Sequence, residues 1–317
     1  MSRLVRRIVA AVSLRWRPAM VLAVVAGSAL TTVVGAAPSR TTAPAPAPAP
    51  VPMAVPRRII SLVPATTEML FAMGAGAQVV GVGSYDHFPA PVERLPRLGG
   101  LIDPSVERIL ALHPDLVVVY DSQADLRRQL DRAGIPQWGY RIQGLADVTA
   151  TMRALGQRIG RAAEAHAAAL AVEARLAAVR DRVAGRTRPR SLLVFGRDPG
   201  TLRGLDASGG YGFLHDLLEL AGGQDVLGDM PRAAVTMSTE MLLGRAPEAI
   251  IEVRPGVPWD TARTEAERRV WWTLPSLPAV RTGRITLLWG DEFVVPGPRV
   301  ALAAERLAAA LHPLQAR

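Results

Sequence analysis

Side chains able to carry out chemistry are few in this 317-residue chain. Cysteine and lysine are both absent, which excludes thiol nucleophiles, thiolate metal sites, Schiff-base lysines and P-loops. A hydrolase would need a nucleophile, a base and an orienting group within reach, and the chain contains no G-x-S-x-G motif. Only His87 lies in a loop suited to a binding site, among the five histidines His87, His113, His166, His215 and His312. We therefore expect a protein that is not an enzyme.

Two glutamates occupy equivalent positions in a repeat with an offset of 133 residues. The first copy reads SVERIL and then PDLVV; the second reads STEMLL and then PEAII. Each copy predicts a serine-capped helix, a proline-marked turn and a buried strand, with Glu107 or Glu240 in the first helical turn. Either glutamate alone is explained by the helix dipole, which favours an acid at this end. Their repetition predicts two similar lobes that each present one carboxylate at the same place.

The loops after the predicted strands carry the candidate ligand contacts. In open α/β sheets, ligands bind beyond the carboxyl ends of the strands, which here means between the two lobes. Each candidate also has an ordinary structural explanation, since loop tyrosines are often half-buried and aspartate is a common turn residue. The candidates are Pro64, Tyr85, Asp86, His87, Tyr120, Asp291 and Phe293.

Asp86 and His87 are the residues that could ligate iron or haem directly. A zinc-binding protein, which is an alternative, would need clustered imidazoles or carboxylates. One loop histidine does not supply such a cluster and is more often a surface residue. We expect no metal site of the protein's own and no resident cofactor.

Strands and helices alternate on both sides of a long helical stretch, which predicts an α/β protein with two Rossmann-like lobes of mostly parallel sheet. In the first lobe, residues 57–146, a helix follows the first strand, with Thr66 or Thr67 as cap and Glu68 in its first turn. Residues 147–185 predict one long rigid backbone helix, Asp147–Val183, of about 50 Å. Residues 186–317 form the second lobe, in which the stretch containing Trp259, Trp271 and Trp272 has no clear pattern.

The first 56 residues predict export and a tether. Residues 1–37 combine a basic start, an uncharged apolar run and small residues suited to cleavage; the alternative is an uncleaved membrane anchor. Residues 38–56 are a Pro/Ala-rich linker of extended polyproline II type. Removing the six arginines of residues 1–56 leaves 31 basic against 28 acidic residues, a net charge of +3. Nucleic-acid binding is therefore not expected.

The region from Arg58 to His312 resembles periplasmic substrate-binding proteins with a helical backbone, the receptors of importers for vitamin B12, siderophores and haem. The similarity is carried by IISLVPATTEMLFAMGAGAQVVGVGSYDHFP, SVERILALHPDLVVV, STEMLLGRAPEAIIEV and GDEFVVPGPRV, in this order, and is strongest to the vitamin B12 receptors. It implies a periplasmic monomer that captures a metal chelate, cobalamin or a related corrinoid first, with ferric siderophore or haem as alternatives. It also implies a dimeric ABC permease with ATPase subunits as the partner.

The resemblance assigns roles to individual residues. Glu107 and Glu240 match the glutamates that dock such receptors on arginine-lined permease pockets, where two separated ion pairs fix orientation. Pro64, Tyr85 and Asp291 fall on corrinoid-contacting positions, and Tyr120 falls where the vitamin B12 receptors have a tryptophan. Three further positions depart from that pattern, namely Leu101, Ala234 and Val295, so the ligand stays open. A structural or sensor protein that has lost its permease is a further alternative.

Overall fold

The structure is a computed structural model that describes residues 54–313. The predicted export segment and almost all of the Pro/Ala-rich linker lie outside these residues, and those two expectations stay predictions. Within the described residues, no helix is both long and apolar enough to cross a membrane.

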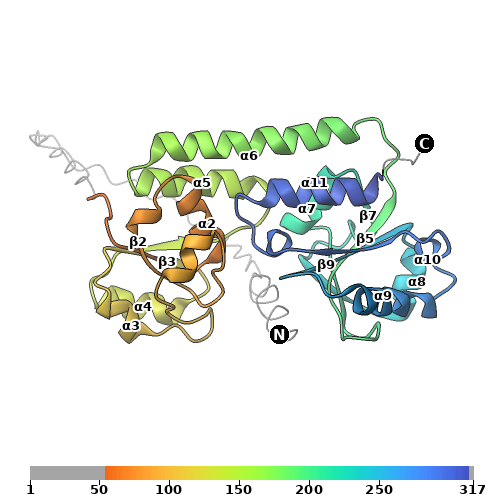
Figure 1. The fold of residues 1–317 in the computed structure, drawn as a ribbon, viewed down its shortest axis with the longest axis horizontal. Coiled ribbons are helices and arrows are strands. Elements are labelled where there is room, and N and C mark those ends of the chain that lie inside the picture. The colour runs from red at the N-terminus through yellow and green to blue at the C-terminus, as the bar shows by residue number, and fades with distance from the viewer. Residues whose placement is uncertain (1–53, 314–317) are drawn as a thin grey trace, which may run out of the picture. The chain divides into compact units, whose positions relative to one another are not determined.

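The N-terminal lobe is built on a four-stranded, fully parallel sheet, with strand order β2-β1-β3-β4 (Figure 1). The short apolar strands β1, β2 and β3 are entirely or largely buried, as expected where helices cover both faces of a parallel sheet, whereas β4 at the edge is only half-buried. In chain order the elements are β1 Ile59–Ser61, α2 Pro64–Ala72, η1 Gly76–Gln78, β2 Val79–Val82, η2 Ala90–Arg94, α3 Val106–Ala111, β3 Leu116–Tyr120, α4 Ala124–Arg132 and β4 Gln137–Tyr140.

The C-terminal lobe contains a six-stranded mixed sheet, with order β10-β9-β5-β6-β8 and β7 paired to β5. The pairs β5–β9 and β9–β10 are parallel, whereas β6 runs antiparallel to both β5 and β8. The elements are β5 Arg190–Gly196, β6 Leu205–Ser208, α7 Phe213–Leu220, β7 Gln224–Asp225, β8 Ala234–Met237, α8 Thr239–Arg245, β9 Ala249–Arg254, α9 Thr261–Arg269, η3 Val270–Thr273, α10 Pro278–Arg281, β10 Ile285–Trp289, η4 Asp291–Phe293 and α11 Val300–Leu311. The prediction of two α/β lobes with mostly parallel sheets is confirmed.

The long interlobe helix is confirmed, but its predicted extent is wrong. The stretch expected to be one rod is divided into α5, Ala146–Arg158, and α6, Ala162–Val183, which pack against each other. Gly160, between them, has a φ of 72°, a conformation that glycine adopts without steric cost and that ends a helix. Gly156 and Ala165 make the close contact of the two helices. Helix α6 then runs over both lobes (Figure 1).

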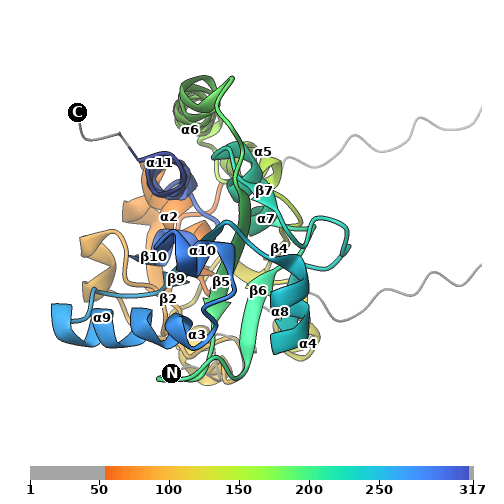
Figure 2. The same ribbon diagram turned by 90° about the vertical axis from the view of Figure 1, so that its right-hand side faces the viewer.

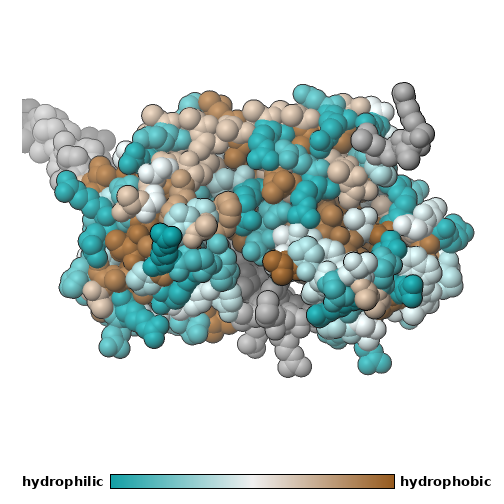
Figure 3. All heavy atoms as spheres, viewed as in Figure 1, coloured by the Kyte–Doolittle hydropathy of each residue, from teal (hydrophilic) through white to brown (hydrophobic). Residues whose placement is uncertain are grey.

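The sequence predicts a rigid helix as the link between the lobes, but the structure also joins them through a shared core. One continuous apolar core includes side chains from both sheets and from α2, α5, α6, α7 and α11. Val172, Leu176 and Val179 of α6 belong to this core, and α6 also contacts α7 and α11 of the C-terminal lobe. The helices therefore connect the lobes by shared burial, which stabilises their relative positions. On the outside, Figure 3 shows hydrophilic and hydrophobic residues mixed over both lobes.

Helix α2 begins earlier than predicted, because Pro64 occupies its first turn. Thr66 and Thr67 therefore lie inside the helix, and their hydroxyls donate to the carbonyl of Val63 instead of capping backbone N–H groups. Glu68, expected in the first turn, lies further along and is 4% exposed.

Candidate functional site

The two repeated glutamates occupy matching sites on α3 and α8. Ser105 Oγ accepts from the backbone N–H of Arg108 at 3.4 Å, and Ser238 Oγ accepts from that of Met241 at 3.1 Å, so both predicted caps are confirmed. Glu107 and Glu240 lie in the first turns of these helices and are exposed. Neither forms an ion pair with any residue that the structure describes.

Helices α3 and α8 lie on the same side of the molecule. Figures 1 and 2 both place them opposite α6, one on each lobe. Two like charges at separated points on one side can meet two separated basic sites on a partner. The geometry therefore agrees with the docking arrangement that the resemblance implies.

The lobes meet where the start of α2 faces the loop between β10 and α11. Arg299, at the beginning of α11, donates from Nη2 and Nε to the two carboxylate oxygens of Glu68, at 2.6 and 3.0 Å. Gly297 passes so close that a Cβ there would lie 2.9 Å from Glu68 Oε2. Tyr140 donates its hydroxyl to the carbonyl of Pro296 at 3.4 Å. Burial raises the pKa of Glu68, although the hydrogen bond and charge of Arg299 act in the opposite direction.

Two of the predicted ligand contacts, Pro64 and Tyr120, lie near this junction, and a third, Tyr85, lies in the loop after β2. Pro64 is half-buried at the start of α2, and Tyr120 ends β3 with its ring edge-on to Tyr140, 5.8 Å between centroids. Tyr85 is 46% exposed, the value expected of a side chain available to a ligand. A Cβ at Gly100 would lie 2.9 Å from the ring of Tyr85, so this glycine leaves space for it.

Asp86 and Phe293, also expected at the ligand, are buried, at 1% and 0% exposed. Neither carboxylate oxygen of Asp86 has a hydrogen-bond partner among the described residues, and the hydroxyl of Thr67 donates to the carbonyl of Val63. Burial raises the pKa of Asp86 to about 7. Phe293 belongs to the shared core, with the guanidinium of Arg306 over its ring. In this conformation neither side chain is accessible to a ligand.

His87 remains exposed, but it is engaged with a neighbour. Its Nδ1 lies 2.9 Å from Glu93 Oε1, and the Glu93 carboxylate also accepts from Arg97. The pKa of Glu93 is lowered, first by the hydrogen bond from His87. Among the described residues, no cluster of three or more His, Cys, Asp or Glu side chains could hold a metal ion.

The structure places the tryptophans that the sequence left unassigned. Trp271 is fully buried and donates from Nε1 to Glu252 Oε2 at 3.3 Å, whereas Trp272 is 43% exposed beside Arg268. Trp259 lies against Trp289, at the carboxyl end of β10, with ring centroids 5.9 Å apart. Asp291 follows Trp289 and accepts from the backbone N–H of Gly256 at 2.8 Å.

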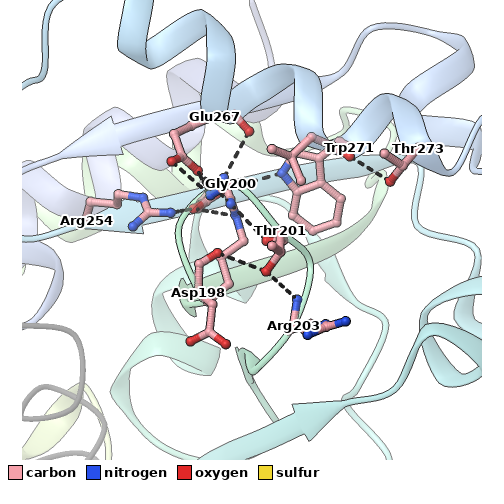
Figure 4. Close-up of polar contacts among 11 residues, drawn as sticks. Asp198, Gly200, Thr201, Arg203, Arg254, Glu267, Trp271 and Thr273 are labelled. Carbon is pink, nitrogen blue, oxygen red and sulfur yellow. Dashed lines mark hydrogen bonds and ion pairs between the residues drawn. The ribbon is translucent and has the colours of Figure 1, made fainter.

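A buried ion network supports the loop after β5 (Figure 4). Arg197, fully buried, lies 3.0 Å from Glu252 Oε1 and 2.7 Å from Glu267 Oε2. The same guanidinium donates to the carbonyl of Thr201, and Glu267 accepts from the backbone N–H of Gly200 at 3.1 Å. This loop lines an open pocket of about 480 Å³ beside the start of α8. Sequence reasoning missed this network and the Glu68–Arg299 pair, because both join residues far apart in the chain.

The chain is similar to characterised binding proteins. Residues 59–289 match the family model described as periplasmic binding protein. The vitamin B12-binding protein of Salmonella typhimurium is 31% identical over 256 residues, which cover 80% of this chain and 90% of that protein. The periplasmic vitamin B12 binding protein BtuF of Vibrio cholerae has a similar structure, with a TM-score of 0.69 and 23% sequence identity. The match covers 81% of this chain and 96% of that protein. A periplasmic heme binding protein of Pseudomonas aeruginosa has a TM-score of 0.70 and 24% sequence identity, and the match covers 83% of this chain and 95% of that protein.

Proposed function

Since this chain belongs to the periplasmic binding protein family, we propose that it is the extracytoplasmic receptor of an ABC importer for a metal chelate. Cobalamin or a related corrinoid is the first candidate ligand, because the 31% identical relative is a vitamin B12-binding protein. A haem or ferric siderophore is the second, because Tyr120 replaces the tryptophan of the vitamin B12 receptors and a heme-binding protein shares the fold.

The observation that carries this proposal is the pair of exposed glutamates on α3 and α8. They lie at equivalent positions on the two lobes and on one side of the molecule. A dimeric permease offers two equivalent basic pockets, so two separated ion pairs would fix the orientation of a monomeric receptor. The ATPase subunits would then supply the energy for release.

Capture requires no bond making or breaking by the protein. Ligand would bind where the lobes meet, near Pro64, Tyr85 and Tyr120. The shared core and the Glu68–Arg299 pair would restrict closure to a small hinge or rocking motion. Export would depend on residues 1–37, and residues 38–56 would serve as a tether if that segment stays uncleaved.

Ligand titration tests the proposal. The purified protein is titrated with cyanocobalamin, iron protoporphyrin and ferric siderophores, while absorbance and melting temperature are followed. We expect one class of chelate to saturate and to raise the melting temperature, since a ligand that binds only the folded state stabilises it. Turnover of a generic ester, with no effect of any chelate on the melting temperature, would support a hydrolase instead.

A further inference from the structure

Two arginines and two tryptophans gather at the carboxyl ends of β9 and β10. Arg254 ends β9, Trp289 ends β10, and the two residues are paired in register on these parallel strands. Ligands of α/β sheets bind beyond this edge. Trp259, from the segment that follows β9, packs edge-on against Trp289 at an interplanar angle of 67°.

Both arginines lie over the same indole. The guanidinium carbon of Arg254 is 4.8 Å from the centre of the Trp259 ring, and that of Arg263 is 4.0 Å from it. A guanidinium over an aromatic face keeps its N–H groups free for an oxyanion, because the contact uses only its flat surface.

The position of Arg254 is fixed by an ion pair with a buried glutamate. One of its terminal nitrogens pairs with Glu252, which is 1% exposed and is also held by Arg197 and Trp271. In Figure 4 the guanidinium of Arg254 is directed towards the side chains gathered between Glu267 and Trp271. This support lowers the entropy that Arg254 would lose on binding a ligand.

Several donors of this cluster have no acceptor. Arg254 Nε and Trp289 Nε1 are buried without a hydrogen-bond partner among the described residues. Arg263 is exposed and forms no ion pair within the part of the chain that the structure describes. The nearby acids are already engaged: Asp260 accepts from the backbone N–H of Arg263, and Asp291 from that of Gly256. Buried donors without partners are costly, so an acceptor supplied from outside would stabilise the site.

We propose that Arg254, Arg263, Trp259 and Trp289 form a carboxylate-binding subsite of the C-terminal lobe, so that the chelate carried by this protein has free carboxylates. This inference rests on the proposed receptor function. Arginine matches the planar carboxylate with two parallel hydrogen bonds, and the indoles provide an apolar wall beside it. Neutral amide side groups, such as those of cobalamin, accept from these donors but do not neutralise the charge of Arg263, so the subsite favours haem, a carboxylate siderophore or a corrin acid over cobalamin itself.

Matched probes test the subsite in the purified protein. One pair is iron protoporphyrin and its dimethyl ester; the other is a corrin with free carboxylates and its methyl ester. The variants are Arg263→Gln, which removes an exposed charge, and Trp289→Phe, which keeps a ring but removes the donor. Arg269→Gln, the same substitution near the other end of α9, is the control.

We expect the wild-type protein to bind the acid of at least one pair about tenfold or more tightly than its ester. Arg263→Gln and Trp289→Phe should each remove most of that preference, and Arg269→Gln should leave it unchanged. Binding of acid and ester with equal affinity, or a preference that survives both substitutions, would overturn the subsite and leave the receptor function intact. Failure of all four probes, of cyanocobalamin and of ferric siderophores to bind would count against the receptor function as well.

Discussion

Arg299 and Glu68 are separated by 231 positions in the chain and form a two-bond ion pair that joins the lobes, with N–O distances of 2.6 and 3.0 Å. The carboxylate is 3% exposed in its side chain and the guanidinium 21%. Burial would lower the pKa of Arg299, but the hydrogen bond and charge of Glu68 raise it overall. The guanidinium also lies 4.3 Å from the ring centre of Phe88 in the N-terminal lobe. A single side chain of α11 thus contacts two segments of the opposite lobe.

Removal of Arg299 should be strongly destabilising. We expect Arg299→Met to lower the free energy of unfolding by about 3–5 kcal/mol, because it leaves the Glu68 carboxylate buried and uncompensated. The measurement is denaturant unfolding at pH 7.5. Glu68→Gln together with Arg299→Met should recover much of the loss, because the carboxylate left without a partner is gone and Glu292, the other acid beside Arg299, still pairs with Arg306.

The control for this pair is Arg175, which forms an equivalent two-bond contact with Glu305 between α6 and α11. Its side chain is 50% exposed, so Arg175→Met should cost about 1 kcal/mol or less. Equal losses from the two substitutions would show that burial does not determine the contribution of the Glu68 pair.

Asp86 should make stability fall as pH rises. Its pKa is raised from 3.8 to about 7 by burial, so between these values the folded state keeps a proton that the unfolded state has released. The free energy of unfolding should therefore decrease from about pH 4 to pH 7, by at most about 4 kcal/mol, and level off above. Asp86→Asn should remove this slope and be more stable than wild type at pH 8.

Denaturant midpoints between pH 4 and pH 8 measure this effect. Asp125→Asn is the control, because the side chain of Asp125 is 87% exposed. A slope that persists in Asp86→Asn would assign the pH dependence to other groups.

The sequence was sufficient for those parts of the fold that local patterns determine. The repeat predicted the two buried strands that follow its prolines, β3 and β9, and its Ser-x-Glu pattern predicted the caps of α3 and α8. These features depend on neighbours a few positions apart. The break between α5 and α6 was missed, because alanine-rich sequence favours helix on both sides and Gly160 is a weak signal by itself.

Features that depend on tertiary contact were not predictable. Asp86 and Phe293 were both expected to contact the ligand, but folding buries both side chains. The same holds for Glu68, whose role depends on a residue at the other end of the chain. The order of the elements placed the candidate ligand contacts on strand-end loops, but which side chains remain accessible there is decided by packing.

The contact of α5 with α6 should be intolerant of a single methyl group. A Cβ at Gly156 would lie 2.1 Å from the Cβ of Ala165, which is fully buried. We expect Gly156→Ala to lower the free energy of unfolding by about 1–3 kcal/mol, because overpacking outweighs the gain in helix propensity.

Gly244→Ala in α8 is the matched control, since no atom lies within 4 Å of its added Cβ. It should stabilise the protein by about 0.5–1 kcal/mol. Thermal and denaturant unfolding of both variants provide the comparison, and stabilisation of both would show that the helices can separate without cost.

Reversal of the two exposed glutamates should separate docking from ligand binding. In Glu107→Arg/Glu240→Arg, both carboxylates are replaced by the charge that arginine-lined permease pockets repel. We expect transport into cells carrying the cognate importer to be abolished, with ligand affinity within about twofold of wild type, because α3 and α8 present these side chains to solvent. Each single reversal should give an intermediate loss.

Glu164→Arg reverses an exposed charge on α6, on the opposite side of the molecule, and should transport normally. A double variant that loses ligand affinity, or that transports as well as Glu164→Arg, would remove these glutamates from the docking surface.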